Sequence, residues 1–355
     1  MTDVLIVEDS RVVRDYLNYI VGSDPALRVI GTATDGEEAL ESVARRRPDV
    51  ILMDIHMPRL DGLETTRRIL SSAHPIPIVI CTASIHFTEV QTAMQALEAG
   101  ALAVLRKPSG FSDPNAEAEG AAIINTLKLM AEVKMVRRWS KKPTPVVAPM
   151  TTRPELSEIM NQMAIVVIGA STGGPAAVLQ VLSFISPATF PATILLVQHI
   201  STGFTVGFTQ WLAEASGWPV RIARDGEMPL SGHVYVAPDD HHLRVGRQRE
   251  LRITQDEPYH GLRPSVGVLF RSVAEHYGRQ AVGILLTGMG RDGAEELKLM
   301  ADRGAFTMAQ DEESCVVFGM PAEAIKLGAA KFIGPPPKIA ERLMLQSLLL
   351  SRGAK

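Results

Sequence analysis

Short apolar runs alternate with helical patterns over the first 125 residues. Runs such as Val4–Val7, Val50–Met53 and Ile78–Cys81 are short and rich in strand-forming residues. The stretch from Ser10 to about Val21 instead carries apolar residues at helical spacing. Continuously apolar strands that alternate with helices are typical of a parallel sheet covered on both faces. The pattern predicts an α/β domain of the flavodoxin-like type, with a five-stranded parallel sheet, over residues 1–125.

The second half of the chain shows the same kind of alternation. Apolar runs at Ala164–Ile168, Thr193–Val197 and Val282–Leu286 have the composition of buried strands. We predict a second, doubly wound parallel α/β domain over residues 161–350. Residues 126–160 include a proline-rich stretch without periodicity, which indicates the end of a helix followed by a linker.

The composition is that of an ordinary soluble globular protein, with 46% apolar and 21% charged residues. A formal net charge of −3 gives no reason to expect binding to nucleic acid or to an anionic membrane. Cys81 and Cys315 are too few for a disulfide framework or a cysteine-based zinc cluster. The chain has no apolar run of membrane-spanning length and no signal-peptide pattern, so we expect a cytoplasmic protein without membrane insertion.

Polar residues follow the predicted strands of the first domain where the strands end. Ligands of parallel sheets bind beyond these carboxyl ends. Clustered carboxylates repel one another and need a cation, and oxygen ligands suit Mg²⁺. A carboxylate can also accept a phosphoryl group, whose charge a lysine would neutralise. Any one of these acids alone would be an ordinary solvated residue, but the set in this order predicts a phosphorylation switch. The set consists of Glu8, Asp9, Asp54, Thr82 and Lys107.

Together with the segment DIHMPRLDGLE at residues 54–64, this set resembles the receiver domain of response regulators. The resemblance implies that Asp54 is the phosphoacceptor and that Mg²⁺ is bound for phosphorylation. The implied metal ligands are Glu8, Asp9, Asp54 and the backbone carbonyl of His56. The implied switch hydroxyl and phosphate-pairing lysine are Thr82 and Lys107. Val104 stands where the family usually has an aromatic residue, three positions before the lysine.

A serine, a histidine and an aspartate follow predicted strand ends in the second domain. They are Ser171 in GASTGG, His199, and Asp292 in TGMGRDGAEEL. A serine becomes a nucleophile when a base takes its proton, which suits a neutral histidine. An acid that accepts the other ring N–H fixes the tautomer of that histidine. A helix is predicted to begin just after Ser171, so that backbone N–H groups of Thr172 and its neighbours would stabilise an oxyanion.

The GASTGG segment has two other interpretations. The α/β-hydrolases order their triad serine, acid, histidine. No Asp or Glu lies between Ser171 and His199, so that a triad here must run Ser, His, Asp. A glycine-rich turn can also bind a dinucleotide phosphate. No acidic residue ends the next strand and no Tyr-x-x-x-Lys occurs, which disfavours a dinucleotide site.

Two further motifs receive a structural interpretation. The adjacent residues His241 and His242 could bind a metal, but loop neighbours of this kind are more often solvent-facing, and we expect that here. The dipeptide Arg263-Pro264 either forms a turn or helps to place a carboxyl-bearing partner surface.

Four segments of the second domain, GASTGGP, LLVQHI, RPSVGVLF and LLTGMGRDGA, are similar to motifs of the CheB family of chemotaxis protein-glutamate methylesterases. The similarity maps the family's triad onto Ser171, His199 and Asp292. It also implies an active-site rim, made of Thr172, Gly173 and Met289. The chain departs from the family at Leu262, where a histidine is common before Arg-Pro, and at Gly267, where an aspartate is common after Ser-Val.

The two resemblances together imply a response regulator whose output is an esterase. Phosphotransfer from a CheA-type histidine kinase to Asp54 would activate hydrolysis of glutamyl methyl esters, and deamidation of glutamines, on methyl-accepting chemotaxis receptors. The catalytic domain would need no cofactor, and we expect a monomer in which the unphosphorylated receiver covers the Ser171 edge. The alternatives are a non-catalytic two-component signalling adaptor and a DNA-binding output. The second is disfavoured because the chain shows no helix-turn-helix pattern or basic recognition helix.

Overall fold

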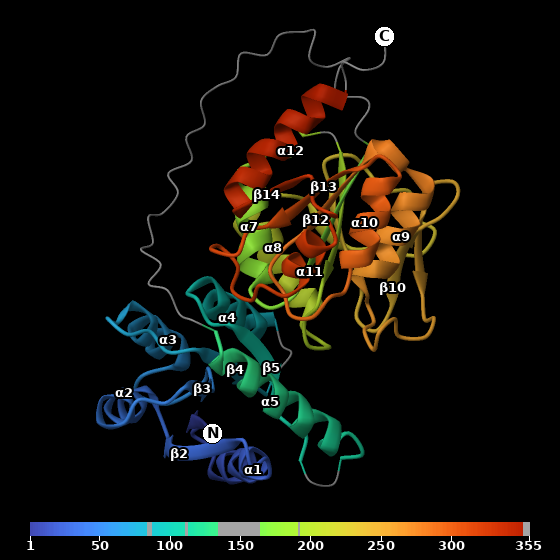
Figure 1. Cartoon of the computed structure of the whole chain (residues 1–355). Coiled ribbons are helices and arrows are strands. Elements are labelled where there is room, and N and C mark those ends of the chain that lie inside the picture. Colours follow the sequence, from blue (N-terminus) through green and yellow to red (C-terminus); the bar gives the residue numbers. More distant parts are fainter. Residues whose placement is uncertain (84–86, 111–112, 134–163, 191, 351–355) are drawn as a thin grey trace. The chain divides into compact units, whose positions relative to one another are not determined.

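The computed structural model describes residues 1–83, 87–110, 113–133, 164–190 and 192–350. Two compact units make up the chain, Met1–Lys141 and Lys142–Lys355 (Figure 1). The predicted boundaries at 1–125, 126–160 and 161–350 stay predictions, because most of the predicted linker lies outside the described residues. No helix within the described ranges is both long and apolar enough to span a membrane.

The first unit is built on a parallel sheet of five strands in the order β2-β1-β3-β4-β5, which confirms the predicted fold. The central strand β3 is buried over its whole length, as its apolar sequence predicts. The strands are β1 (Thr2–Val7), β2 (Leu27–Ala33), β3 (Val50–Met53), β4 (Ile78–Thr82) and β5 (Ala103–Arg106).

Helices connect these strands and pack in two groups, since α1 packs against α5, while α3 packs against both α2 and α4. Asp35 and Asp61 begin α2 and α3 as N-caps, because their side chains accept backbone N–H bonds of the first turn. The helices are α1 (Arg11–Gly22), α2 (Gly36–Arg45), α3 (Gly62–Ser71), α4 (Phe87–Glu98) and α5 (Ala116–Ala131).

The second unit contains a parallel sheet of seven strands in the order β14-β13-β12-β6-β7-β9-β8, and the doubly wound prediction is confirmed. The chain leaves β6 toward β7 on one side and later returns through β12 on the other. Such a reversal of strand order opens a crevice at the carboxyl ends of the strands. The strands are β6 (Ile165–Ala170), β7 (Thr193–Gln198), β8 (Val220–Ile222), β9 (Val234–Val236), β12 (Ala281–Leu285), β13 (Phe306–Gln310) and β14 (Phe332–Gly334).

An antiparallel hairpin of β10 (His242–Val245) and β11 (Leu251–Thr254) stands outside this sheet, and β10 packs against α9. The core includes the buried rings of Trp218, Tyr235 and Phe270. The helices are α7 (Gly174–Ser183), α8 (Thr205–Ser216), α9 (Val266–His276), α10 (Ala294–Asp302), α11 (Met320–Lys326) and α12 (Pro336–Leu350), with a short 3-10 turn at Gly278–Gln280 (Figure 1).

Candidate functional sites

Three carboxylates meet at the carboxyl edge of the first sheet. Oxygens of Glu8, Asp9 and Asp54 all lie within 4.8 Å of one another. Strand pairing brings these residues together, because β1 and β3 are neighbours in the sheet and the Asp54 N–H donates to the Val7 carbonyl at 2.9 Å. Glu8 and Asp54 are buried, whereas Asp9 is exposed. A dense set of oxygen donors open to solvent on one side fits a hard divalent cation.

Lys107 joins the two buried carboxylates of this cluster. Its Nζ lies 2.7 Å from Oε2 of Glu8 and 2.9 Å from Oδ2 of Asp54. Burial raises the pKa of both carboxyl groups, although the hydrogen bonds from Lys107 oppose the shift. Burial alone would lower the pKa of Lys107, but the bonds to the two carboxylates raise it. The cluster therefore holds its lysine charged between two acids.

The remaining predicted receiver residues lie around this cluster. Thr82 is buried at the end of β4, and its carbonyl accepts the Lys107 N–H at 2.9 Å. Val104 is buried on β5. His56 is exposed, two residues beyond Asp54. These positions are compatible with the predicted roles.

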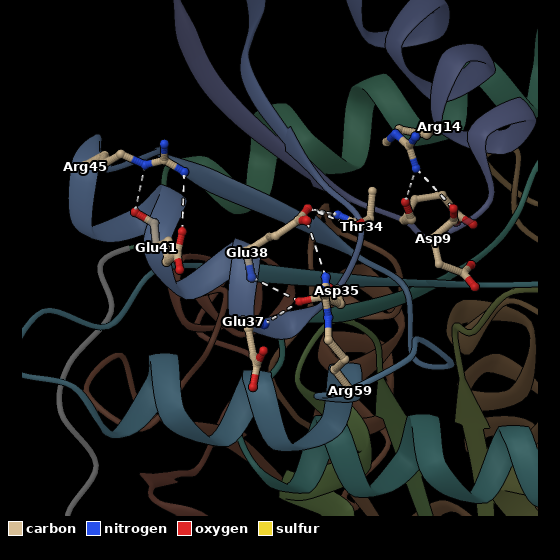
Figure 2. A network of polar contacts seen from close by, with 10 residues as sticks. Asp9, Arg14, Thr34, Asp35, Glu37, Glu38, Glu41, Arg45 and Arg59 are labelled. Atoms are coloured by element: carbon tan, nitrogen blue, oxygen red, sulfur yellow. Dashed lines mark hydrogen bonds and ion pairs between the residues drawn. The ribbon is translucent and has the colours of Figure 1, made fainter.

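The turns that carry the acids are held by residues that sequence reasoning missed. Arg14 Nη1 donates to the carbonyls of Glu8 and Asp9 at 2.6 and 3.2 Å, as Figure 2 shows. Arg59, whose φ is +62°, forms an ion pair with the buried Asp35 (Figure 2). An arginine five residues after the second acid of an acidic pair, within the first helical turns, is a signal that could have pointed to Arg14.

The loop after β3 requires a glycine at one position. A Cβ on Gly62 would lie 1.9 Å from the carbonyl oxygen of Asp54, and the Gly62 N–H donates to the Ile55 carbonyl at 2.9 Å. The loop therefore folds back tightly onto the residue that precedes it.

Ser171 and His199 are brought together by the register of two strands. Ala170 pairs with Gln198 across β6 and β7, so that Ser171 and His199 each follow a paired residue. The His199 N–H donates to the Ala170 carbonyl at 2.9 Å, and the Ser171 N–H donates to the Thr287 carbonyl at 3.0 Å. The loop after β12 thus reaches the same edge.

Asp292 completes this arrangement. Its Oδ2 lies 3.0 Å from Nε2 of His199, a close contact rather than an aligned hydrogen bond, since Nε2 has no regular hydrogen-bond partner. The carboxylate accepts the Ser265 hydroxyl at 2.8 Å and the N–H groups of Val266 and Gly267 at 2.7 and 3.0 Å. Burial would raise the pKa of Asp292, but the His199 ring and these donors lower it. Asp292 is therefore held as an anion beside the imidazole.

Two polar side chains lock the strand ends, and sequence reasoning missed both. Gln198 Nε2 donates to the carbonyls of Ser171 and His199 at 2.8 and 2.9 Å. The Thr287 hydroxyl donates to the Thr172 carbonyl at 2.9 Å and accepts the N–H groups of residues 316 and 317. A glutamine and a threonine that end apolar strands are the only sequence signal for them.

The predicted rim residues lie at the same edge. Gly173 has a φ of +75° at the start of α7, and a Cβ there would lie 2.5 Å from Cβ of Val316. Thr172 connects Ser171 to this glycine. Met289 is 44% exposed in the loop after β12. Glycine is needed at 173 because both its conformation and its close neighbour exclude a side chain.

The expectation that His242 faces solvent was wrong. His242 is completely buried, because β10 packs against α9.

The departure from the family at Gly267 has a structural explanation. A Cβ at Gly267 would lie 2.7 Å from Oε2 of the buried Glu296 and 3.1 Å from Oδ1 of Asp292. The side chain of Glu296 thus occupies the space next to Gly267. Its Oε1 accepts bonds from Tyr259 and Arg271.

Comparisons with known proteins agree with this two-part organisation. Residues 4–116 match the response regulator receiver domain, and residues 166–343 match the CheB methylesterase family. A receiver domain followed by a methylesterase domain defines a response regulator with an enzymatic output.

Relatives of known name extend the similarity to nearly the whole chain. A protein-glutamate methylesterase/protein-glutamine glutaminase of Nitrosospira multiformis is 52% identical, over 99% of this chain and 98% of its own length. One from Syntrophus aciditrophicus is 50% identical, over 97% and 98%. The crystal structure of the CheB methylesterase catalytic domain from Thermotoga maritima is similar, with a TM-score of 0.50 and 37% identity over 51% of this chain and 97% of that one. The chain belongs to the CheB family, which confirms the predicted enzyme class over the adaptor.

Proposed function

We propose that this chain hydrolyses glutamyl methyl esters and deamidates glutamines on chemoreceptors, under control of receiver phosphorylation. The observation that carries the proposal is the edge of the second sheet, where the anionic Asp292 lies 3.0 Å from His199 and both strand ends converge at Ser171. Family membership supplies the substrate class, since the named relatives are protein-glutamate methylesterases.

The positions of the side chains support the following steps. Nε2 of His199 faces Asp292, so that Nδ1 is the ring nitrogen left to take the Ser171 proton. The serine oxygen attacks the ester carbonyl, and the bond to the methoxy group breaks as His199 returns the proton, which releases methanol. Water then attacks the acyl carbonyl as His199 takes its proton, and the bond between the acyl carbon and the Ser171 oxygen breaks. His199 returns the proton to the Ser171 oxygen as the glutamate carboxylate leaves. A glutamine follows the same path with ammonia as the first product.

The oxyanion would be stabilised at the start of α7. Backbone N–H groups of Thr172 and Gly173 follow the nucleophile there, and the positive end of the helix dipole favours a developing negative charge. Met289, exposed on the neighbouring loop, would form an apolar rim for the substrate. These steps use side chains and backbone groups of the chain itself.

The receiver site would control this chemistry. We infer that Glu8, Asp9, Asp54 and the His56 carbonyl hold Mg²⁺, which would offset the carboxylate charges and bind phosphoryl oxygens. A CheA-type histidine kinase would transfer its phosphoryl group to Asp54. Lys107 already contacts Asp54 and would pair with the added charge, and Thr82 would bond a phosphoryl oxygen.

The cytoplasmic location, the monomeric state and the absence of nucleic-acid binding or membrane insertion stay predictions. The same holds for cover of the Ser171 edge by the unphosphorylated receiver. Deleting residues 1–150 should then raise basal esterase activity.

Labelling with a serine-reactive phosphonate tests the proposed nucleophile. We expect mass spectrometry to find the label on Ser171, and expect labelling to fail in Ser171→Ala and to slow strongly in His199→Ala. Ser201→Ala, which removes another serine just beyond β7, is the matched control and should label like the wild type. Labelling that persists in Ser171→Ala would contradict the assignment.

A further inference from the structure

Two buried polar residues behind Asp292 take no part in the mechanism above. Ser265 is the N-cap of α9 and His242 is the first residue of β10, and neither side chain is exposed at all. Buried polar side chains are costly unless they are bonded, so that their partners indicate what they do.

Ser265 binds Asp292 with a hydrogen bond of fixed direction. Its Oγ lies 2.8 Å from Oδ1 of Asp292 and also accepts the Val268 N–H at 3.4 Å. An ionised carboxylate can only accept, so the hydroxyl proton of Ser265 must point to Asp292. The contact therefore fixes one oxygen of the carboxylate, while the other faces His199.

His242 binds Ser265 from the opposite side. Its Nδ1 accepts the Ser265 N–H at 3.3 Å, and its Nε2 lies 3.2 Å from the carbonyl of Glu257. A carbonyl can only accept and an N–H can only donate, so that these two contacts require the proton on Nε2 and none on Nδ1. Burial lowers the pKa of His242, which favours the neutral ring that both contacts need.

We propose that His242 and Ser265 are positioning residues that hold the carboxylate of Asp292 against His199. The connection runs from the Glu257 carbonyl through the neutral ring of His242 to the Ser265 N–H, and from the Ser265 hydroxyl to Asp292. The proposal rests on the proposed function, in which Asp292 orients the catalytic base. It assigns His242 a role in catalysis without contact with substrate.

Two substitutions of His242 separate positioning from mere packing. An asparagine amide reaches the position of Nδ1 and can still accept the Ser265 N–H. A glutamine amide reaches the position of Nε2 and can donate to Glu257, but it leaves the Ser265 N–H without its acceptor. Both substitutions replace the ring by an amide, so that loss of packing is similar. A catalytic group displaced by about 1 Å can lose up to about 100-fold in rate.

The test measures methanol release from methylated receptor fragments by the full chain, activated with Mg²⁺ and acetyl phosphate. We expect kcat to fall roughly 10- to 100-fold in His242→Gln and in Ser265→Ala, with KM unchanged. His242→Asn should keep at least about ten times the kcat of His242→Gln. The rate of phosphonate labelling at Ser171 should follow kcat. Equal losses in the two His242 variants, wild-type kcat in Ser265→Ala, or a change in KM alone would overturn the proposal.

A measurement on the unaltered chain covers the case in which His242 variants do not fold. Nitrogen NMR of the labelled histidines should show His242 as a neutral ring protonated on Nε2 at pH 7, and a charged ring or the Nδ1 tautomer would overturn the proposal. The two failures are distinguishable. A wild-type chain that releases no methanol refutes the proposed function, whereas an active wild type with unaffected Ser265→Ala refutes this inference alone.

Discussion

Replacement of Asp292 by asparagine tests how the proposed catalytic base is supported. Three groups donate hydrogen bonds to the carboxylate, the Ser265 hydroxyl and the N–H groups of Val266 and Gly267, and the His199 ring lies against one of its oxygens. An asparagine has one oxygen and one NH₂ group. Donors lie on both sides of the carboxylate, so the NH₂ group would face a donor in either orientation. The fold should lose about 1–3 kcal/mol, the usual cost of leaving buried polar groups unpaired.

The effect on catalysis should be much larger than the effect on stability. The imidazolium that forms at His199 loses its negative neighbour, and the NH₂ group favours the wrong tautomer of the ring. A change of this kind in a serine, histidine and aspartate triad costs about 10⁴-fold in kcat, which corresponds to about 5 kcal/mol of activation free energy.

The assay is initial-rate methanol release from methylated receptor fragments, with urea unfolding to confirm that the variant is folded. Asp302→Asn is the matched control, because Asp302 is an exposed aspartate at the end of α10 and should keep wild-type kcat. An Asp292→Asn variant that keeps more than about a tenth of the wild-type kcat would refute the triad assignment.

Three further predictions follow from other parts of the structure. Gly62→Ala should abolish phosphorylation by acetyl phosphate and destabilise the fold by roughly 1–3 kcal/mol, because the new Cβ collides with the Asp54 carbonyl; wild-type phosphorylation and urea midpoint would contradict this. Lys107→Met leaves the buried Glu8 and Asp54 without their shared partner. Without Mg²⁺ at pH 7, the free energy of unfolding of the receiver in urea should therefore fall by about 3 kcal/mol or more, and an unchanged midpoint would count against the contact. Folding lowers the pKa of Asp292, so the ionised carboxylate stabilises the fold at pH values above its ordinary pKa of 3.8. This contribution is lost as the pH falls through the pKa of the folded state. The stability difference between wild type and Asp292→Asn, followed by urea unfolding, should therefore shrink below about pH 4, and a difference that grows in acid would contradict the sign.

The strand ends were the part of the two sites that the sequence predicted best. Ser171 and His199 each follow an apolar strand, and parallel strands joined by one helix are commonly neighbours, as β6 and β7 are. The acids after β1 and β3 were predicted to meet because the carboxyl ends of parallel strands lie at one edge of the sheet, and their oxygens do lie close together. Periodicity and chain direction are enough to predict such an edge.

Contacts between distant segments could not be predicted in this way. The order of strands places β12 beside β6, and pattern alone does not specify this order. Asp292 was a candidate because it follows a predicted strand, and the family resemblance assigned it to the triad. His242 was expected at the surface because a turn precedes it, but the packing of β10 on α9 buries it. The pairing of Arg59 with Asp35 likewise depends on how two loops meet. A local pattern carries no information on such packing.

The measurement that tests the central claim most directly is methanol release from methylated cytoplasmic fragments of chemoreceptors. Wild type and Ser171→Ala would be compared, each with and without Mg²⁺ plus acetyl phosphate. The account predicts release by the wild type that rises on phosphorylation and is absent in Ser171→Ala. No release by the wild type under any condition, or equal release by Ser171→Ala, would contradict it.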